Sequence, residues 1–343
     1  MKLLHNPNVI PAEFAGAVVA IGNFDGVHLG HLAVLDKARA VATKQSAPLV
    51  VLTFEPHPRL FLRPQLEHFC LTPLTLKARL LGLAGVDAVI AARFDGEFAG
   101  LGAHDFVARY LSGRLEAGHV VTGENFFFGK GREGDTAMLA KLCGEAGISA
   151  SAVATASTVA TAAPDQGGAQ RAYSSTAVRD ALKGGEPELA GHLLGHWWGL
   201  EGEIVEGDKR GRSIGFPTAN MVLADGMAPA FGVYVVRARL IGADGGFSPA
   251  IGGVANLGLR PTFARDNPVL ESHLFDFDRD IYGQTMLVEL IRYLRPERKF
   301  DGIDQLKAQI AADAESATST LAGLARDGDP MAAYPIGAAL AQA

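Results

Sequence analysis

From residue 17 to about residue 150, short apolar runs alternate with segments whose apolar positions recur every three or four residues. Residues 17–21 form an unbroken apolar run rich in β-branched side chains, as expected of a strand buried on both faces. The next segment places apolar residues at 32, 35, 38 and 41, on one face of a helix. The same reasoning predicts further strands at 49–54, 88–90 and 119–123 and helices at 76–82 and 105–111. This alternation predicts an α/β domain with a parallel sheet, in which ligands bind at the carboxyl ends of the strands.

Beyond residue 187 the pattern changes to short strands with frequent glycines, which is typical of a β-domain. Residues 270–278 alternate as a strand, with positions 270, 272 and 274 on the face opposite Glu271, His273 and Phe275. We therefore expect a first domain at 1–185, a second at 186–325 and a tail at 326–343. The tail is rich in alanine and contains proline and glycine, so we expect it to fray and assign it no function. Residues 161–170 are predicted to form a hairpin tip or a mobile loop.

The bulk composition narrows the class of protein. A chain of 343 residues is long enough for two domains with a core each. Its net charge of -6 gives no support to a nucleic-acid or anionic-membrane partner. The two cysteines, Cys70 and Cys143, lie in unrelated contexts, which excludes a disulfide framework or a zinc ribbon. No segment approaches the apolar length of a membrane span, so we expect a cytoplasmic protein that does not bind membranes.

The junction between the first strand and its helix carries the first candidate chemistry. His28 and His31 are three residues apart in the first helical turn, beside the unpaired N–H groups and the positive end of the helix dipole. Gly30 removes a side chain where a nucleotide must come close, and Gly22 and Gly26 free the loop backbone. Two imidazoles there can hydrogen-bond a phosphate and offset charge that develops on it. From the residues alone, a histidine pair that caps the helix or binds a metal remains open.

Three further polar clusters follow predicted strands or precede a helix. Residues 54–59 place His57 between two prolines, and on spacing alone a turn that ends the strand is the simpler interpretation. Residues 123–135 contain a G-x-G-x-x-G spacing, but no acidic residue follows about 20 positions on, which argues against an NAD site. Residues 173–182 combine three hydroxyl side chains with Arg179, which suits either a helix N-cap or a second phosphate cradle.

The second half of the chain contains a loop with three glycines and three cations at residues 207–215. Its backbone N–H groups and charges could cover phosphates, although such loops are often only solvated turns. Thr218 and Asn220 follow as oxygen-bearing side chains, which suit magnesium beside phosphates. Glu271 lies on a strand face of the small β-domain, where the simple interpretation is an outward-facing carboxylate.

The ten residues from Gly22 to His31, Gly-Asn-Phe-Asp-Gly-Val-His-Leu-Gly-His, closely resemble the signature of the bacterial bifunctional riboflavin kinase and FMN adenylyltransferase family, also called FAD synthetases. Gly-x-Pro-Thr-Ala-Asn at 215–220 resembles the signature of riboflavin kinase. Other segments are similar to family strings and occur in the family's order, from about residue 17 to about residue 313; they are 54–59, 71–77, 123–134, 173–179, 231–236, 253–263 and 295–300.

This resemblance implies a fold, an activity and a set of site residues. The fold would be a Rossmann-like nucleotidylyltransferase domain with a parallel sheet, followed by a small antiparallel β-barrel and a C-terminal helix at about 303–325. The barrel would phosphorylate riboflavin with ATP to give FMN, and the first domain would transfer AMP from ATP to FMN, giving FAD and pyrophosphate. ATP is the co-substrate and magnesium the cofactor, with small molecules as partners and a monomer or weak homo-oligomer as the assembly.

By resemblance, Glu271 is the catalytic base of the kinase, and His28 and His31 act in adenylyl transfer. Thr218 and Asn220 would hold the metal. The expected adenylyltransferase ATP and phosphate contacts are Gly22, Asn23, Phe24, Asp25, Gly30, Asn125, Ser174, Ser175, Thr176 and Arg179. The expected kinase ATP and flavin contacts are Gly207, Lys209, Arg210, Gly211, Arg212, Gly215, Pro217, Asn256 and Arg260.

Two positions depart from the family's pattern. Ala177 stands where many relatives carry arginine, and Glu55 stands where aspartate is more usual. They leave room for a first domain that transfers a nucleotide to another phosphate ester. A flavin sensor without turnover is a further alternative. The joint presence of five residues argues against it, namely His28, His31, Thr218, Asn220 and Glu271.

Overall fold

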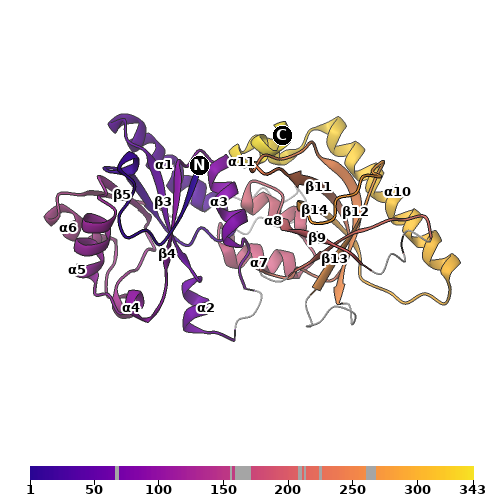
Figure 1. Ribbon diagram of the computed structural model, residues 1–343, viewed down its shortest axis with the longest axis horizontal. Helices are drawn as coiled ribbons and strands as arrows, with labels where there is room; N and C mark the ends of the chain where they lie inside the picture. Colours follow the sequence, from indigo (N-terminus) through magenta and orange to yellow (C-terminus); the bar gives the residue numbers. More distant parts are fainter. Residues whose placement is uncertain are drawn as a thin grey trace. The chain divides into compact units, whose positions relative to one another are not determined.

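The computed structural model describes residues 1–65, 69–154, 157–158, 171–207, 211, 214–223, 226–259 and 268–343. The chain forms two compact units, Met1–Ser175 and Thr176–Ala343, and each is described by itself below (Figure 1). The domain boundary that we expect at residue 185 lies one helix after the division between these two units, and it stays a prediction. The hairpin tip expected at 161–170 lies outside the described residues.

The first unit contains the parallel sheet that the alternating pattern predicts. In the described residues its strands lie in the order β1-β4-β3-β2-β5-β6, and every neighbouring pair is parallel. The strands are β1 (Lys2–His5), β2 (Val18–Ile21), β3 (Leu49–Glu55), β4 (Ala88–Arg93), β5 (His119–Gly123) and β6 (Ser149–Val153). The order reverses at β2, which lies between β3 and β5, and this switch point is where an open α/β sheet binds its ligands.

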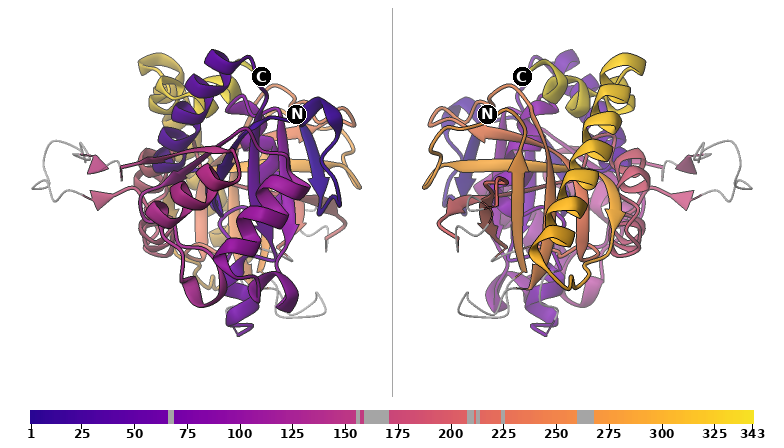
Figure 2. Two further views of the ribbon diagram at one scale, coloured as in Figure 1. Left: turned by 90° about the vertical axis from the view of Figure 1, so that its left-hand side faces the viewer. Right: turned by 90° about the vertical axis from the view of Figure 1, so that its right-hand side faces the viewer.

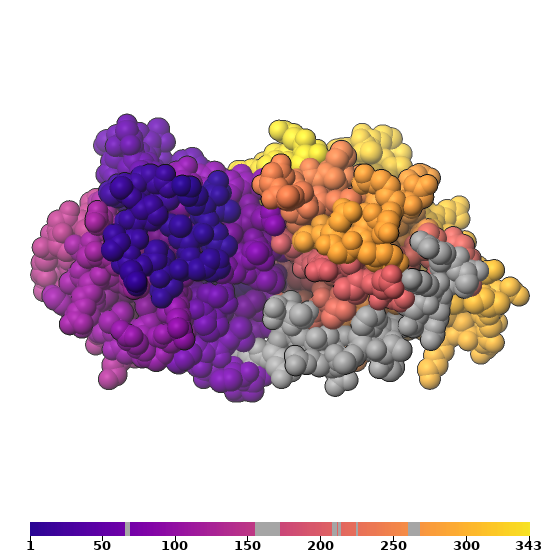
Figure 3. All heavy atoms as spheres, in the orientation of Figure 1, coloured from indigo at the N-terminus to yellow at the C-terminus, as the bar shows by residue number. Residues whose placement is uncertain are grey.

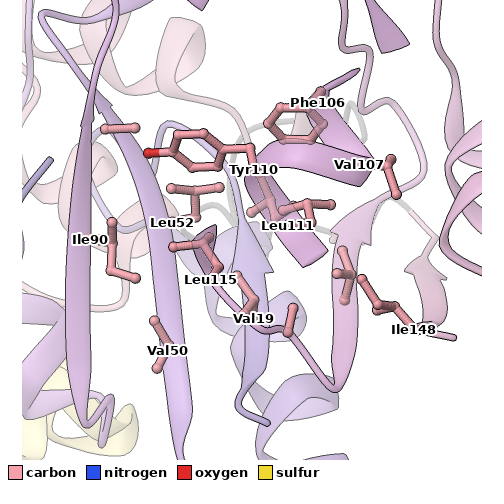
Figure 4. Packing of buried hydrophobic residues seen from close by; sticks show 14 of the residues in the cluster. Val19, Val50, Leu52, Ile90, Phe106, Val107, Tyr110, Leu111, Leu115 and Ile148 are labelled. Carbon is pink, nitrogen blue, oxygen red and sulfur yellow. The ribbon is translucent and has the colours of Figure 1, made fainter. Parts of the chain in front are cut away.

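Helices connect these strands and bury their apolar faces against the sheet. They are η1 (Ala12–Phe14), α1 (Leu29–Gln45), α2 (Pro58–Leu62), α3 (Leu74–Leu83), α4 (Gly96–Ala99), α5 (Ala103–Asp105), η2 (Phe106–Arg114), η3 (Lys130–Arg132) and α6 (Thr136–Glu145). The helix expected at 105–111 is present, but η2 has π-type hydrogen bonding. It places Phe106, Tyr110 and Leu111 in the core beside the side chains of β2, β3 and β4 (Figure 4).

The outermost strands of this sheet reach the surface. The edge strand β1 has exposed residues at both ends, and the first residues of the chain, drawn in indigo, form part of the visible surface (Figure 3). At the other edge, β6 is only partly covered. A separate antiparallel pair, β7 (Ser157–Thr158) and β8 (Arg171–Ala172), lies apart from the parallel sheet (Figure 2).

The second unit is built on a closed antiparallel barrel, which confirms the expected fold class. Around the barrel the described strands follow the order β10-β13-β12-β11-β14-β9. They are β9 (Gly199–Val205), β10 (Ala219–Val222), β11 (Gly232–Ile241), β12 (Ile251–Leu259), β13 (Pro268–Leu274) and β14 (Thr285–Arg295). Two helices precede the barrel, α7 (Ser175–Lys183) and α8 (Pro187–Leu194), and α10 (Ile303–Asp327) follows it. The predicted alternation in β13 is confirmed, because Leu270, Ser272 and Leu274 are buried while Glu271 and His273 are partly exposed.

The expectation that residues 326–343 fray is wrong. They form η4 (Pro330–Ala333) and α11 (Pro335–Gln342), and each helix begins with a proline in its first turn, where no N–H is needed. Met331, Ile336 and Leu340 are buried and fix these helices to the fold, although the composition of the segment is typical of a loose tail. The carboxylate of Asp329 accepts hydrogen bonds from the Trp197 indole at 3.0 Å and from Arg237 at 2.7 Å. The segment is therefore part of the folded second unit.

Candidate active sites

In the first unit, the loop after β2 leads directly to the N-terminus of α1 at the switch point of the sheet. Asp25 in this loop is 1% exposed, and its Oδ1 accepts hydrogen bonds from the backbone N–H groups of Leu71 at 2.8 Å and Thr72 at 3.1 Å. In return, the Gly26 N–H donates to the Thr72 hydroxyl at 3.0 Å. These three bonds fix the loop to the segment that leads into α3.

Two non-glycine residues of the loop have left-handed backbone conformations. Phe24 has a φ of 47° and Val27 a φ of 45°, and both side chains are buried. Such a conformation is a genuine outlier for a β-branched residue and costs on the order of 1–3 kcal/mol. The hydrogen bonds around Asp25 and the burial of both side chains hold the loop in this strained shape. The loop is therefore preorganised rather than adaptable.

The histidine pair forms a reciprocal cap on α1. His28 is the N-cap residue, its Nδ1 accepts from the His31 N–H at 3.3 Å, and the Nδ1 of His31 accepts from the His28 N–H at 3.3 Å. The two rings stack with centroids 3.6 Å apart and planes 17° apart. Because each Nδ1 is an acceptor, each neutral ring carries its proton on Nε2. The capping interpretation is therefore correct, and the cap uses the Nδ1 atom of each ring.

Burial holds the pKa of His31 well below its ordinary value of 6.5, and electrostatic interactions with the His28 ring and with Lys77 lower it further. The His31 ring is therefore neutral at physiological pH and donates a hydrogen bond without carrying charge. Gly30 keeps the approach to this pair open, since a Cβ at residue 30 would lie only 3.1 Å from the His28 ring and 3.4 Å from the Tyr173 Cβ.

Two of the other expected contacts lie against this loop. The Ser175 hydroxyl donates to the Asp25 carbonyl at 2.8 Å, which brings residues 173–175 to the loop, Ser174 among them. The Asn23 carbonyl accepts from the Thr53 hydroxyl at 3.1 Å, and Gly22 leaves no room for a side chain because its Cβ would lie 3.2 Å from the Phe24 ring. Thr176 and Arg179 belong to α7 in the second unit, where Arg179 is buried.

Asn125 follows β5, the strand beside β2 at the switch point, and is exposed. Of the three aromatic residues after it, Phe127 is also exposed, while Phe126 and Phe128 pack against the core. Phe128 is buried and stacks on Phe126 with centroids 5.7 Å apart. Phe128 is also fixed by two backbone hydrogen bonds with Gly134, of 3.0 and 2.9 Å. The turn therefore anchors itself in the core through Phe128 and presents Asn125 to solvent.

In the second unit, three adjacent strands place the kinase candidates in one row. Glu271 on β13 lies directly opposite Asn220 on β10 and directly opposite Asn256 on β12. Residues directly opposite one another in a sheet share a face, so the three side chains lie side by side. Their chain neighbours Met221, Leu257 and Leu270 are buried and fill the barrel, which puts the row on its outer face.

The chain around Thr218 folds back against this row. A Cβ at Gly207 would lie 2.5 Å from the Asn220 amide nitrogen, so only glycine permits this approach. The Asn220 Nδ2 donates to the Thr218 carbonyl at 3.4 Å, and the His273 ring contacts the Pro217 carbonyl at 2.9 Å.

The turn before this segment is held by two of the remaining expected contacts. The Gly211 carbonyl accepts hydrogen bonds from the N–H groups of Ile214 at 3.2 Å and Phe216 at 2.8 Å, and Gly215 has a φ of 94°. Lys209, Arg210, Arg212 and Arg260 lie outside the described residues.

Two residues beside this row were missed by sequence reasoning. Glu297 accepts a hydrogen bond from the Asn256 amide at 2.9 Å, and a side chain at Gly258 would collide with its carboxylate. His273 is the other, since it fixes Pro217. The strand alternation put His273 on the Glu271 face, but no local signal shows that Glu297 approaches Asn256 from 41 positions away.

The protein offers few oxygen ligands near this row. This suits a magnesium ion, which takes most of its remaining ligands from substrate phosphates and water. Because the Asn220 amide nitrogen donates to a carbonyl, its Oδ1 is the atom that could serve as a ligand, beside the Thr218 hydroxyl. Among the described residues, no group of three or more His, Cys, Asp or Glu side chains could hold a metal ion by itself.

Comparison with known proteins now adds to this geometry. An FAD synthetase family model matches residues 10–162, and a riboflavin kinase family model matches residues 194–321. The bifunctional riboflavin kinase/FMN adenylyltransferase of Escherichia coli K12 is 40% identical over 316 residues, which cover 91% of this chain and 96% of the relative. The chain belongs to this family. The Bacillus subtilis protein of the same name is 36% identical over 323 residues, covering 92% of this chain and 96% of that one.

The family membership confirms the resemblance, the domain order and the fold class that the motifs indicated. An FAD synthetase domain comes first and a riboflavin kinase domain follows. A solved structure described as a macrolide-efflux protein from Streptococcus pneumoniae is 30% identical, with a TM-score of 0.78, and covers 93% of this chain and 99% of that one. It supports the fold, and the efflux name belongs to that protein. In the described part of this chain, no helix is long and apolar enough to span a membrane.

Proposed function

We propose that this chain makes both flavin cofactors in sequence. The second unit transfers the γ-phosphate of ATP to the ribityl 5′-hydroxyl of riboflavin and produces FMN. The first unit transfers AMP from ATP to FMN and produces FAD and pyrophosphate. The observation that carries the proposal is the family membership, and it is supported by the reciprocal histidine cap in one unit and by the row of Asn220, Glu271 and Asn256 in the other.

For the kinase reaction, we assign Glu271 as the general base. It takes the proton from the riboflavin hydroxyl as that oxygen attacks the γ-phosphorus, and ADP leaves with the electron pair of the broken P–O bond. Thr218 and Asn220 would hold magnesium, which when bound offsets the negative charge of the phosphates. The expected contacts to ATP and flavin are Asn256 and the loop residues Gly207, Lys209, Arg210, Gly211, Arg212, Gly215 and Pro217, together with Arg260.

Adenylyl transfer needs no proton transfer, because a phosphate oxygen of FMN is already a nucleophile. It attacks the α-phosphorus of ATP, and pyrophosphate leaves with the electron pair of the broken bond. The protein must therefore position the two phosphates and neutralise charge. We assign His28 and His31 to this purpose, together with the positive end of the helix dipole at the N-terminus of α1. We keep Asn23, Asn125, Ser174, Ser175, Thr176 and Arg179 as further contacts, with Gly22 and Gly30 giving close approach.

Phe24 and Asp25 are buried residues of this loop, and their burial favours a positioning role over direct contact with ATP. We also propose a domain boundary at residue 185, a cytoplasmic location and a monomer or weak homo-oligomer. These three proposals rest on the sequence pattern.

One time course tests both activities. Purified protein is incubated with riboflavin, ATP and magnesium, and the flavins are separated by chromatography. We expect FMN to rise and then give way to FAD. Glu271→Gln should block the formation of FMN but still convert added FMN to FAD, whereas His28→Ala with His31→Ala should do the reverse. FMN without FAD would refute the first-unit assignment, and flavin binding without any product would favour a sensor.

A further inference from the structure

Lys77 is a buried cation that the mechanism above does not use. It lies in α3 and is 2% exposed. Its backbone N–H donates to the Pro73 carbonyl at 2.9 Å, but among the described residues its ammonium group takes part in no hydrogen bond or ion pair. The ammonium nitrogen is not among the fully buried atoms that lack a hydrogen-bond partner, so it keeps a narrow contact with solvent. A cation that is largely removed from water and has no partner in the protein favours the binding of an anion.

The position of Lys77 shows where that partner would bind. The chain enters α3 through Leu71 and Thr72, the two residues that Asp25 fixes to the loop before α1. Lys77 follows five positions later, and its positive charge acts on His31. The ammonium group therefore lies within electrostatic reach of the His31 imidazole, on an element that is fixed to the same loop.

The chemistry of the surrounding groups favours an anion. The N-terminus of α1 presents the positive end of the helix dipole beside the His31 ring, and the one carboxylate in the loop, on Asp25, already accepts hydrogen bonds from two backbone amides. A triphosphate placed there meets donors and positive charge from several sides. A lysine contributes a compact, strongly hydrated charge, which gains most from a phosphate once it has been removed from water.

We propose that Lys77 is a further phosphate-binding residue of the first unit and that its ammonium group donates to a phosphate of bound ATP. The identity of the nucleotide rests on the proposed function. ATP is favoured over the FMN phosphate because Lys77 acts on His31, which caps the helix N-terminus where the triphosphate is expected. In this assignment the ligand-free enzyme carries an unfavourable buried charge, and ATP binding relieves it.

Two substitutions separate this role from a structural one. Lys77→Met removes the charge and keeps a long apolar stem, and Lys77→Arg keeps the charge. Lys37→Met, at an exposed lysine on α1, is the matched control. The assay measures the rate of FAD formation from FMN and ATP. The rate of riboflavin phosphorylation by the same protein is the internal reference. For each variant we would also measure the midpoint of thermal unfolding without ATP and the binding of ATP by calorimetric titration.

For Lys77→Met we expect the KM for ATP in FAD formation to rise about 10- to 100-fold, as for the loss of a hydrogen bond between charged groups. The KM for FMN and the rate of riboflavin phosphorylation should stay within about twofold. The ligand-free thermal midpoint should stay the same or rise, because the substitution removes an unpaired buried charge. Lys77→Arg should recover part of the affinity for ATP, and Lys37→Met should match the wild type.

An unchanged KM for ATP, or a lower midpoint without ATP, would overturn the proposal, since Lys77 would then be indifferent or structural. A rise confined to the KM for FMN would overturn the assignment to ATP. The titrations keep this inference apart from the proposed function. If the wild type forms no FAD, the proposed function fails. The titrations still decide the role of Lys77, because they show whether Lys77→Met loses or keeps one of the two ATP-binding events expected for two ATP sites.

Discussion

Asp25 offers the sharpest test of how the first site is held. Its Oδ1 is the acceptor for the N–H groups of both Leu71 and Thr72, and both of those residues are 1% exposed. Asp25→Ala leaves two buried N–H groups without this acceptor, at about 1–3 kcal/mol each. We therefore expect a loss of about 2–6 kcal/mol in the free energy of unfolding of the first unit.

Asp25→Asn is the matched control, because its amide oxygen can still accept both bonds. It removes only the charge on the acceptor, so we expect it to cost about 1–2 kcal/mol. Urea unfolding, followed by the loss of FAD formation with increasing urea, measures both variants. Riboflavin phosphorylation reports on the second unit and should retain the urea midpoint of the wild type. Equal midpoints for the alanine and asparagine variants would refute the reasoning.

Three other expectations can be checked on the same protein. Glu271→Gln should slow riboflavin phosphorylation about 10²–10⁴-fold without changing FAD formation from FMN, and an unchanged kinase rate would remove Glu271 from the role of base. The folded protein resists protonation of His31, whose pKa is lowered, while the unfolded chain takes up the proton near its ordinary value of 6.5. The free energy of unfolding should therefore fall as the pH falls below about 6.5, and His31→Asn should flatten this dependence in pH-resolved urea titrations. Met331→Ala should cost the second unit about 2–5 kcal/mol, because Met331 is fully buried; a change below about 0.5 kcal/mol would mean that residues 326–343 are not part of its fold.

The sequence predicts the sheet of the first unit well where strands are buried on both faces. β2 is entirely apolar, β3 and β4 are mostly apolar, and β5 has an apolar centre; all four are found close to their expected bounds. β1 and β6 were not predicted, because these edge strands lie partly exposed and carry mixed residues without a clear period. Local pattern therefore identifies a strand only when burial imposes one.

The motifs identify the candidate residues, but they do not identify the hydrogen-bond partners and strand neighbours that position them. The bonds from Asp25 span 46 and 47 positions in the sequence, and nothing near Asp25 indicates its partners. Asn220, Glu271 and Asn256 become neighbours only through the pairing register of three strands, which depends on the whole barrel. The last helices were misjudged because three anchoring side chains weigh little in an alanine-rich composition, although their burial decides the fold there.

The strict alternation in β13 has a consequence for how this gene can change. Even-numbered positions from 270 to 274 fill the barrel, and the odd-numbered positions Glu271 and His273 face the candidate kinase site. Substitutions at the two sets can therefore be selected separately, the first for stability and the second for chemistry. An insertion or deletion of one codon within this strand exchanges the two sets at once, because a shift by one residue reverses every side chain. Natural variants of this strand should thus differ by substitution and keep its length.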